Sequence, residues 1–185
     1  LTNGERFVTP ELKEQEARES RLKRELDDIA NKGSTASSPL LDALRSRGQK
    51  AAALGRVIEV KPDAEPWWPL LETLVGHNRQ AVLAEDFTAA WDQAQRLGHI
   101  DEPLVNTTEL GKAAKTKAGS VAAMFDTSHE AARAFLDHLY GDLVAVDKAK
   151  QLDKHPRALS KDGWLKDPPL RLHLRVQRFS RRDRA

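Results

Sequence analysis

The order of apolar and polar positions predicts short strands alternating with helices between residues 39 and 170. Short apolar runs, several of them β-branched, predict strands at 55–60, 80–84, 143–146 and 157–160, with a further possible strand at 104–105. Apolar residues at helical spacing predict helices at 39–47, 66–75, 87–97, 128–140 and 147–152. Residues 107–119 have no clear periodicity and predict a loop or a short helix. This alternation indicates a mixed α/β fold in two halves.

Side-chain spacing also predicts which faces are buried. In helix 87–97 we expect the inward face to carry Phe87, Ala90, Trp91 and Ala94. In helix 128–140 we expect it to carry Ala131, Ala132, Phe135 and Leu139. Beyond residue 169, Leu170, Leu172, Leu174 and Val176 alternate with Arg171, His173, Arg175 and Gln177. This alternation predicts a half-buried strand with one basic face.

The first forty residues differ from the rest. Residues 11–30 are charged and helix-prone, and Leu22, Leu26 and Ile29 have the spacing of a coiled-coil seam. The intervening seam positions are polar, so an ordinary surface helix stays an equal alternative. We therefore predict an arm end and linker at 1–38, an α/β domain at 39–170 with halves 39–106 and 120–170, and a basic exit strand at 171–185. Because the chain begins with Leu1, we expect it to be part of a longer protein.

Charge is concentrated at one end of the 185 residues. The formal net charge is +2, yet residues 171–185 contain six arginines and one aspartate. The guanidinium group binds phosphate and carboxylate oxygens in pairs, so this strip is suited to nucleic-acid phosphates. A solvated chain end is an equally good interpretation.

The sequence lacks the residues that several kinds of catalytic, metal-binding and phosphate-binding site require. The absence of cysteine excludes disulfides, thiolate zinc sites and thiol nucleophiles, and the ten scattered glycines form no phosphate-binding loop. His138 near Asp137 and Asp142 is better explained by charges at a helix end than by acid–base catalysis, and the four tryptophans are better explained as core or interface anchors than as stacking platforms for bases. No apolar run approaches the roughly 18 residues of a membrane span. We therefore expect no metal, no cofactor and no membrane contact, and a cytoplasmic location.

Two stretches resemble a known family. They are ALGRVIEVKPDAEPWWPLLETLVGHNRQAVLAEDFTAAWDQAQ at 53–95 and LDHLYGDLVAVDKAKQLDKHPRALSKDGWLK at 136–166. Their order and spacing resemble the two halves of the hinge domain of SMC-type chromosome-organising ATPases. The pieces GRVIEVKP…WW, GDLVAVD and HPRALSKDG are most similar to the condensin-like subunit of bacterial Wadjet plasmid-defence systems and its MukB-like relatives. SMC hinges carry paired glycines after the Asp-Gly turn, but no glycine follows Gly163 here, so that dimer contact does not carry over.

The resemblance implies a homodimer that joins two coiled-coil arms, contacts double-stranded DNA and catalyses no reaction. ATPase heads, kleisin and nuclease-type subunits would belong to the rest of a bacterial complex and would not contact this domain. The candidate dimer residues are Leu143, Val144, Ala145 and Val146, because we expect an exposed sheet edge at this strand that could pair across the dimer. The candidate DNA-binding residues are Arg171, Arg175, Arg178, Arg181 and Arg182, then Lys112, Lys115 and Lys117. The alternatives are a monomeric DNA-binding module and a small α/β ligand-binding or enzyme domain.

Overall fold

The computed structural model describes residues 15–19, 21, 38–111 and 115–176. The chain divides into two units, Leu1–Ser37 and Ser38–Ala185. In the first unit, residues 15–19 are helical, whereas the seam residues Leu22, Leu26 and Ile29 lie outside the described part. No helix among the described residues is both long and apolar enough to cross a membrane.

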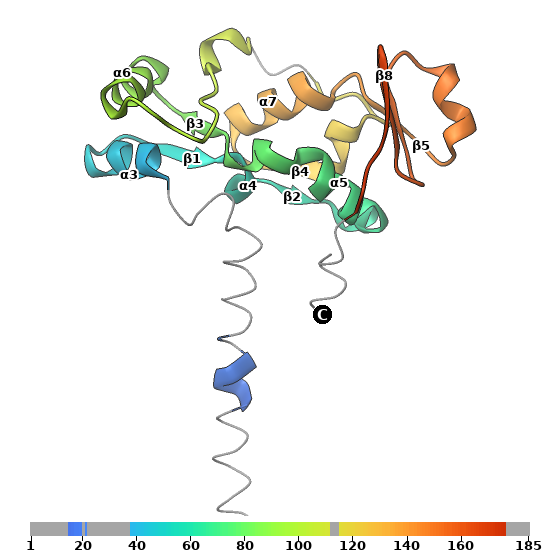
Figure 1. Ribbon diagram of the computed structural model, residues 1–185, viewed down its shortest axis with the longest axis horizontal. Coiled ribbons are helices and arrows are strands. Elements are labelled where there is room, and N and C mark those ends of the chain that lie inside the picture. Colours follow the sequence, from blue (N-terminus) through green and yellow to red (C-terminus); the bar gives the residue numbers. More distant parts are fainter. Residues whose placement is uncertain (1–14, 20, 22–37, 112–114, 177–185) are drawn as a thin grey trace, which may run out of the picture. The chain divides into compact units, whose positions relative to one another are not determined.

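The first half of the second unit is built from short helices around small pieces of sheet (Figure 1). Its elements are α3 (Pro39–Ser46), β1 (Ala51–Ala53), α4 (Leu54–Val57), β2 (Glu59–Val60), η1 (Pro62–Trp67), α5 (Trp68–Val75), η2 (Gly76–Gln80), β3 (Val82–Ala84) and α6 (Phe87–Leu97). β1 pairs with β3 in antiparallel fashion. The possible strand at 104–105 is reduced to a single parallel bridge between Leu104 and Val82.

The second half carries the larger sheet. Its elements are η3 (Thr107–Glu109), η4 (Val121–Met124), β4 (Phe125–Asp126), α7 (Glu130–Tyr140), β5 (Val144–Val146), η5 (Ala149–Lys154), β6 (Ala158–Ser160), β7 (Trp164–Asp167) and β8 (Leu170–His173). The strand order is β5-β6-β7-β8, with β5 and β6 parallel and the other pairs antiparallel. β4 instead pairs with β2 of the first half, so this small ribbon joins the two halves.

One apolar core is shared by both halves. Leu54, Leu71 and Leu83 from the first half form a single cluster with Leu136 and Leu159 from the second. All five side chains are at most 1% exposed. A second cluster holds α3 against α6 and β3 through Leu40, Leu44 and Ala90. Because the largest cluster draws on both halves, we expect the second unit to unfold in a single step.

Local capping explains where the main helices begin. At the start of α3, the Ser38 side chain accepts a hydrogen bond from the backbone N–H of Leu41. At the start of α6, the Asp86 side chain accepts a hydrogen bond from the backbone N–H of Ala89. His129 does the same at α7, where its Nδ1 accepts from the N–H of Ala132 at 3.2 Å. α6 ends at Gly98, whose φ of 80° is a conformation that favours glycine.

The strand predicted at 55–60 is wrong for most of its length. Residues 54–57 form helix α4, and only Glu59 and Val60 are extended. A Cβ atom on Gly55 would lie 3.2 Å from that of Arg79, so glycine allows α4 to pack closely on η2. This tertiary contact overrides the strand propensity of the β-branched neighbours. Three alanines, which are poor strand formers, make β1 because they pair with β3.

The helices predicted at 39–47, 66–75, 87–97 and 128–140 are present, but the buried faces of α6 and α7 are rotated from the predicted ones. On α6 the buried residues are Ala90, Gln93 and Ala94, while Trp91 is 51% exposed. Ala90 and Ala94 pack in one cluster with the leucines of α3, and Trp91 lies outside this cluster. On α7 the fully buried line is Ala132, Leu136 and Tyr140. The residues predicted there, Ala131, Phe135 and Leu139, lie at its margin and are only partly buried.

Replacing Leu136 tests the shared core. Leu136→Ala should lower the free energy of unfolding by about 2–5 kcal/mol, because a fully buried leucine leaves a cavity. Urea denaturation followed by circular dichroism measures the change. Trp91→Ala, at an exposed apolar position, should change it by less than about 1 kcal/mol. Similar losses for both variants, or two separate unfolding transitions, would contradict this arrangement of the core.

Candidate interaction surface

β8 is an edge strand, and its outer side is open within the described part of the chain. Its register with β7 pairs Leu165 with Leu172 and Asp167 with Leu170. The N–H of Leu174 donates to the carbonyl of Gly163 at 2.8 Å. Backbone groups alternate in direction along an antiparallel pair. The backbone N–H and C=O groups of Arg171 and His173 therefore point away from β7.

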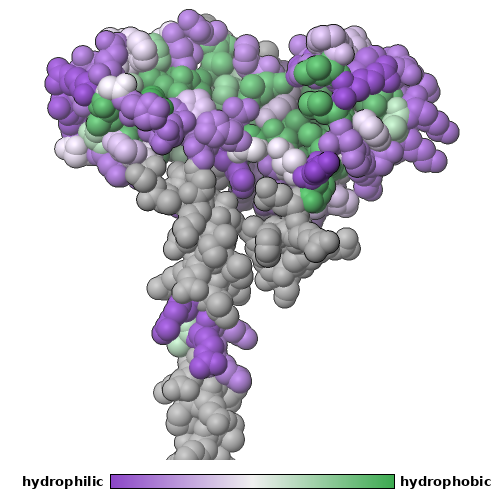
Figure 2. Space-filling view, in the orientation of Figure 1, coloured by the Kyte–Doolittle hydropathy of each residue, from purple (hydrophilic) through white to green (hydrophobic). Residues whose placement is uncertain are grey.

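The apolar side chains of β8 are largely uncovered. Leu170 is 55% exposed, Leu172 is 45% exposed and Val176, just beyond the strand, is 44% exposed. The half-buried strand predicted from the alternation is therefore wrong: all four β8 residues are exposed. Only Leu174, past the end of the strand, packs against the main core. In the orientation of Figure 1, Figure 2 shows apolar side chains emerging between polar ones on the second unit.

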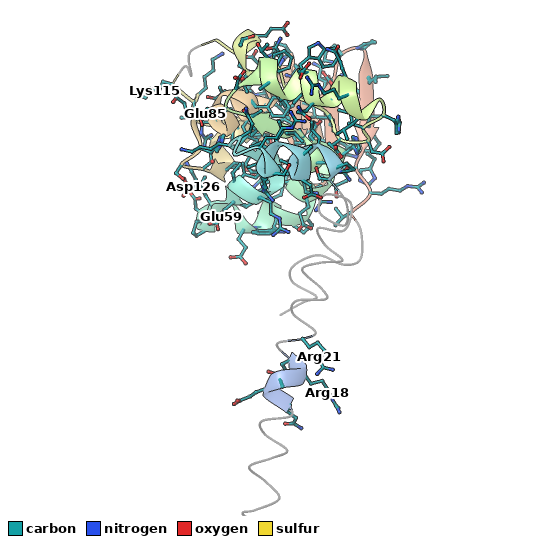
Figure 3. All side chains as sticks on the ribbon, turned by 90° about the vertical axis from the view of Figure 1, so that its left-hand side faces the viewer. Arg18, Arg21, Glu59, Glu85, Lys115 and Asp126 are labelled. Carbon is teal, nitrogen blue, oxygen red and sulfur yellow. The ribbon has the colours of Figure 1, made fainter. Side chains whose placement is uncertain are left out.

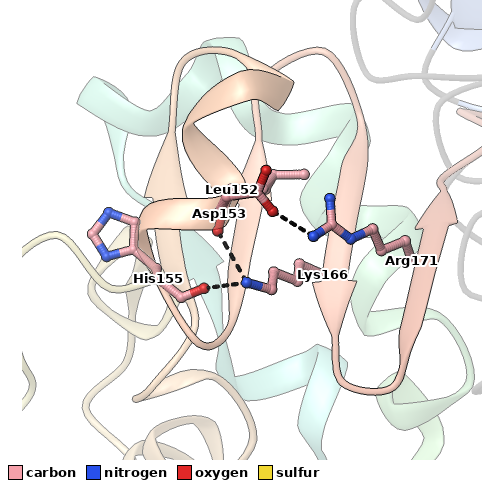
Figure 4. Close-up of polar contacts among 5 residues, drawn as sticks. All are labelled: Leu152, Asp153, His155, Lys166 and Arg171. Atoms are coloured by element: carbon pink, nitrogen blue, oxygen red, sulfur yellow. Dashed lines mark hydrogen bonds and ion pairs between the residues drawn. The ribbon is translucent and has the colours of Figure 1, made fainter.

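Polar contacts hold the β7–β8 hairpin to η5 (Figure 4). Lys166 Nζ donates to the carbonyl oxygens of His155 at 2.9 Å and Leu152 at 3.5 Å. Arg171 forms an ion pair with Asp153. The hydrogen bond from Arg171, together with its charge, holds the pKa of Asp153 below its ordinary value. These contacts fix the hairpin in place, although nothing described covers the apolar side chains of β8.

The predicted dimer residues on and before β5 lie in a different environment from the one expected. Leu143 is fully buried in the main core. β5 pairs with β6 on one side, and on the other side the N–H of Ala145 donates to the carbonyl of Gly119 at 3.1 Å. The expectation of a free strand edge is therefore wrong, because residues 119–121 occupy it. A dimer role for Leu143, Val144, Ala145 and Val146 stays a prediction without that support.

The described DNA-binding candidates fall into two groups. Lys115 and Lys117 precede η4, and Lys117 Nζ forms an ion pair with Asp142 at 2.9 Å. Arg171 lies on β8 and is also paired, whereas Arg175 just beyond it is exposed and has no ion pair with a described residue. Arg178, Arg181, Arg182 and Lys112 lie outside the described residues. Binding of DNA by any of them stays a prediction.

Sequence analysis missed an open groove of about 800 Å³ at the end of β8. We call it the end groove. It is lined by Pro66, Pro69, Leu70, Lys161, Asp162, His173, Leu174, Arg175 and Val176. Three separate segments contribute these residues. No local pattern could show that they meet, although the alternating basic residues after 170 marked one wall.

The β2–β4 ribbon carries an acidic pair that sequence analysis also missed. Glu59 and Asp126 are direct cross-strand partners and both are exposed (Figure 3). Neither carboxylate has an ion pair with a described residue. Like charges directly opposite on a ribbon destabilise it, so this pair favours a cationic partner. Among the described residues, no group of three or more His, Cys, Asp or Glu side chains could hold a metal ion.

Known structures share this architecture, although no family model and no curated protein matches the chain. The SMC hinge domain of Geobacillus stearothermophilus, solved as an asymmetric dimer, superimposes with a TM-score of 0.64 at 14% identity, covering 93% of this chain and 79% of its own. The SMC hinge domain of Pyrococcus furiosus superimposes with a TM-score of 0.55 at 17% sequence identity. The match covers 78% of this chain and 84% of the Pyrococcus chain. The Pyrococcus furiosus Smc hinge domain with an extended coiled coil superimposes with a TM-score of 0.54 at 15% sequence identity. That match covers 92% of this chain and 70% of the other. The chain therefore has the fold of SMC hinge domains, as its resemblance predicted.

The Arg171–Asp153 pair can be tested by titration. Because the pKa of Asp153 is lowered in the folded chain, its ionised form stabilises the fold at pH values above its unfolded pKa of about 3.9. That contribution is lost as the pH falls through the folded pKa. In Arg171→Gln the Asp153 titration midpoint, followed by carboxyl-carbon NMR, should rise. Arg175→Gln removes an unpaired arginine nearby and should leave it unchanged; a similar rise there would contradict the specific pairing.

Proposed function

We propose that this chain is the dimerisation hinge of an SMC-like protein and that it self-associates through the open edge of β8. The observation that carries the proposal is an exposed strand edge lined on one side by Leu170 and Leu172. An open edge with exposed apolar residues is a ready site for pairing with another chain. The shared fold with SMC hinge domains, one of them solved as a dimer, supports it.

Charge indicates which surface of the second copy β8 would meet. Two β8 strands paired with one another would bring the positively charged Arg171 and Arg175 close to the same arginines of the second copy, and like charges would repel. The β2–β4 ribbon instead offers the exposed carboxylates of Glu59 and Asp126. A dimer in which each β8 meets the partner's β2–β4 ribbon would contain two equivalent contacts, as two-fold symmetry requires.

The finer identity rests on the sequence alone. We propose a parent protein of the Wadjet plasmid-defence or chromosome-organising type, supported by the pieces GRVIEVKP…WW, GDLVAVD and HPRALSKDG. In that setting the hinge would join two coiled-coil arms in the bacterial cytoplasm, without a cofactor and without catalysis. Kleisin and nuclease-type subunits would contact other parts of the parent protein.

Weak contact with duplex DNA is a second candidate function. It is supported by Arg175 and Lys115, which are exposed and have no ion pair with a described residue, and by the arginine-rich composition of 171–185. Such contacts neutralise phosphate charge and carry no base specificity. If the chain stayed monomeric, this would describe a DNA-binding module instead of a hinge.

A single charged residue on β8 should disrupt the dimer. We expect the unaltered chain to have twice its mass of 20.7 kDa in light scattering, and Leu172→Lys to shift it towards the monomer across a tenfold range of concentration. A lysine there would place a charge in the buried contact. Trp91→Lys makes the same kind of change at an equally exposed apolar site on α6 and should remain dimeric.

Further variants of the acidic ribbon test the orientation of the two copies. Glu59→Lys with Asp126→Lys should weaken the dimer several-fold if β8 meets the ribbon of the partner. A Leu172→Lys chain that dimerises as tightly as the original would rule out β8 as the contact. A chain that is monomeric at every concentration would overturn the hinge proposal for these 185 residues.

Salt dependence tests the DNA proposal separately. Fluorescence-anisotropy titrations with a duplex oligonucleotide give the slope of log affinity against log salt, which is negative. Its magnitude should fall by about 0.9 when Arg175→Gln removes one phosphate contact. Arg96→Gln removes an arginine that is paired with Asp92 on α6, and should leave the slope unchanged. Equal effects of the two variants would show that Arg175 makes no particular phosphate contact.

A further inference from the structure

We infer that the end groove docks an extended, acidic peptide segment of a partner protein, held by an apolar side chain in the groove. Dimerisation is not needed for this inference, and because His173 also belongs to the edge proposed for self-association, the peptide and a second copy would compete for that edge. The residues of the groove are those around the end of β8 and beyond, from 173 to 176, together with Pro66, Pro69 and Leu70 of η1 and α5 and the turn at 161–162. Three properties of the groove point to this kind of partner: its largely apolar lining, its unpaired cations and its open backbone edge.

The lining of the groove is largely apolar. Five of its nine lining residues are Pro66, Pro69, Leu70, Leu174 and Val176. Gly163 lies next to Leu70 and His173 of the lining, and its φ of 102° is a conformation that favours glycine. At about 800 Å³, the groove is within the size range of ligand pockets and far larger than a single phosphate ion needs.

The rim of the groove carries two cations without counter-ions. Lys161 and Arg175 are exposed, and neither has an ion pair or side-chain hydrogen bond with a described residue. Nearby basic side chains are occupied: Lys166 binds two carbonyl groups and Arg171 binds Asp153. The one carboxylate in the lining, on Asp162, accepts a hydrogen bond from Ser160, and the Asp162 carbonyl lies 3.2 Å from His173 Nε2. The groove therefore favours an anionic ligand.

The backbone edge distinguishes a peptide from a nucleic acid. The N–H and C=O groups of His173 face the open side of β8, as its register with β7 requires. An extended peptide can add to such an edge as a further strand, with alternate side chains entering a neighbouring pocket. A sugar–phosphate backbone has no N–H groups to continue the ladder. The apolar lining, the two cations and the open backbone edge together fit a peptide segment in which acidic and apolar residues alternate.

A labelled model peptide tests the inference directly. The probe is a fluorescein-labelled octapeptide of alternating aspartate and leucine, titrated by anisotropy, with a lysine–leucine octapeptide of equal length beside it. We expect the acidic peptide to bind and the basic one not to bind. Lys161→Glu with Arg175→Glu should weaken binding about tenfold or more, because two favourable charge pairs become repulsive. Val176→Asp should weaken binding of the acidic peptide as well, because it places a negative charge in the apolar part of the lining.

Matched controls separate this site from general attraction between charges. Lys150→Glu with Lys154→Glu makes the same change of charge on η5, outside the groove, and should alter affinity less than twofold. Equal weakening by both double variants would overturn the inference. Equal binding of an aspartate–glycine octapeptide would also overturn the inference. Tighter binding of an oligothymidine of similar charge, weakened by the same changes at Lys161 and Arg175, would overturn it as well. Light scattering on each variant shows whether the dimer is intact, so failure of the groove and failure of the hinge proposal are distinguishable.

Discussion

The position of every surface element depends on the burial of leucines from both halves in one core. Leu54 and Leu71 from the first half and Leu136, Leu143 and Leu159 from the second are all removed from water in a single cluster. Apolar burial is the dominant favourable term in folding, and none of the short strands here would be stable alone. The shared cluster sets where α7 and the main sheet lie. It also fixes which parts of β8 and α6 remain outside.

The exposed hairpin is a consequence of that limited core. Leu165 and Leu174 reach the cluster, but the core ends before Leu170 and Leu172. Arg171, Lys166 and Arg157 hold the hairpin rigid through bonds to Asp153, to carbonyl groups and to Asp167. A rigid edge with uncovered leucines costs little reorganisation when a second chain pairs with it. At its far end the same strand forms one wall of the end groove, so two surfaces with different chemistry lie along one strand.

Helices were easier to predict from this sequence than strands, for local reasons. α3, α6 and α7 begin at Ser38, Asp86 and His129, whose side chains accept backbone hydrogen bonds three residues on. Such signals lie within one turn and can be found in the sequence. β1 consists of alanines, and β2 follows a stretch that is helical instead of extended. These strands exist because β3 and β4 lie beside them, and that proximity is decided by contacts distant in sequence.

The sequence by itself determined the mixed α/β class, the order of most elements and the concentration of arginine after residue 170, since composition, spacing and capping are local properties. The similarity of two stretches to SMC hinge domains also came from the sequence, and the fold agrees with it. Only the tertiary structure decided that β5 has no free edge, that β8 does, and that Glu59 faces Asp126. It alone brought Pro66, Lys161 and Arg175 around one groove. These features depend on which segments the shared core brings together, and no local pattern encodes that.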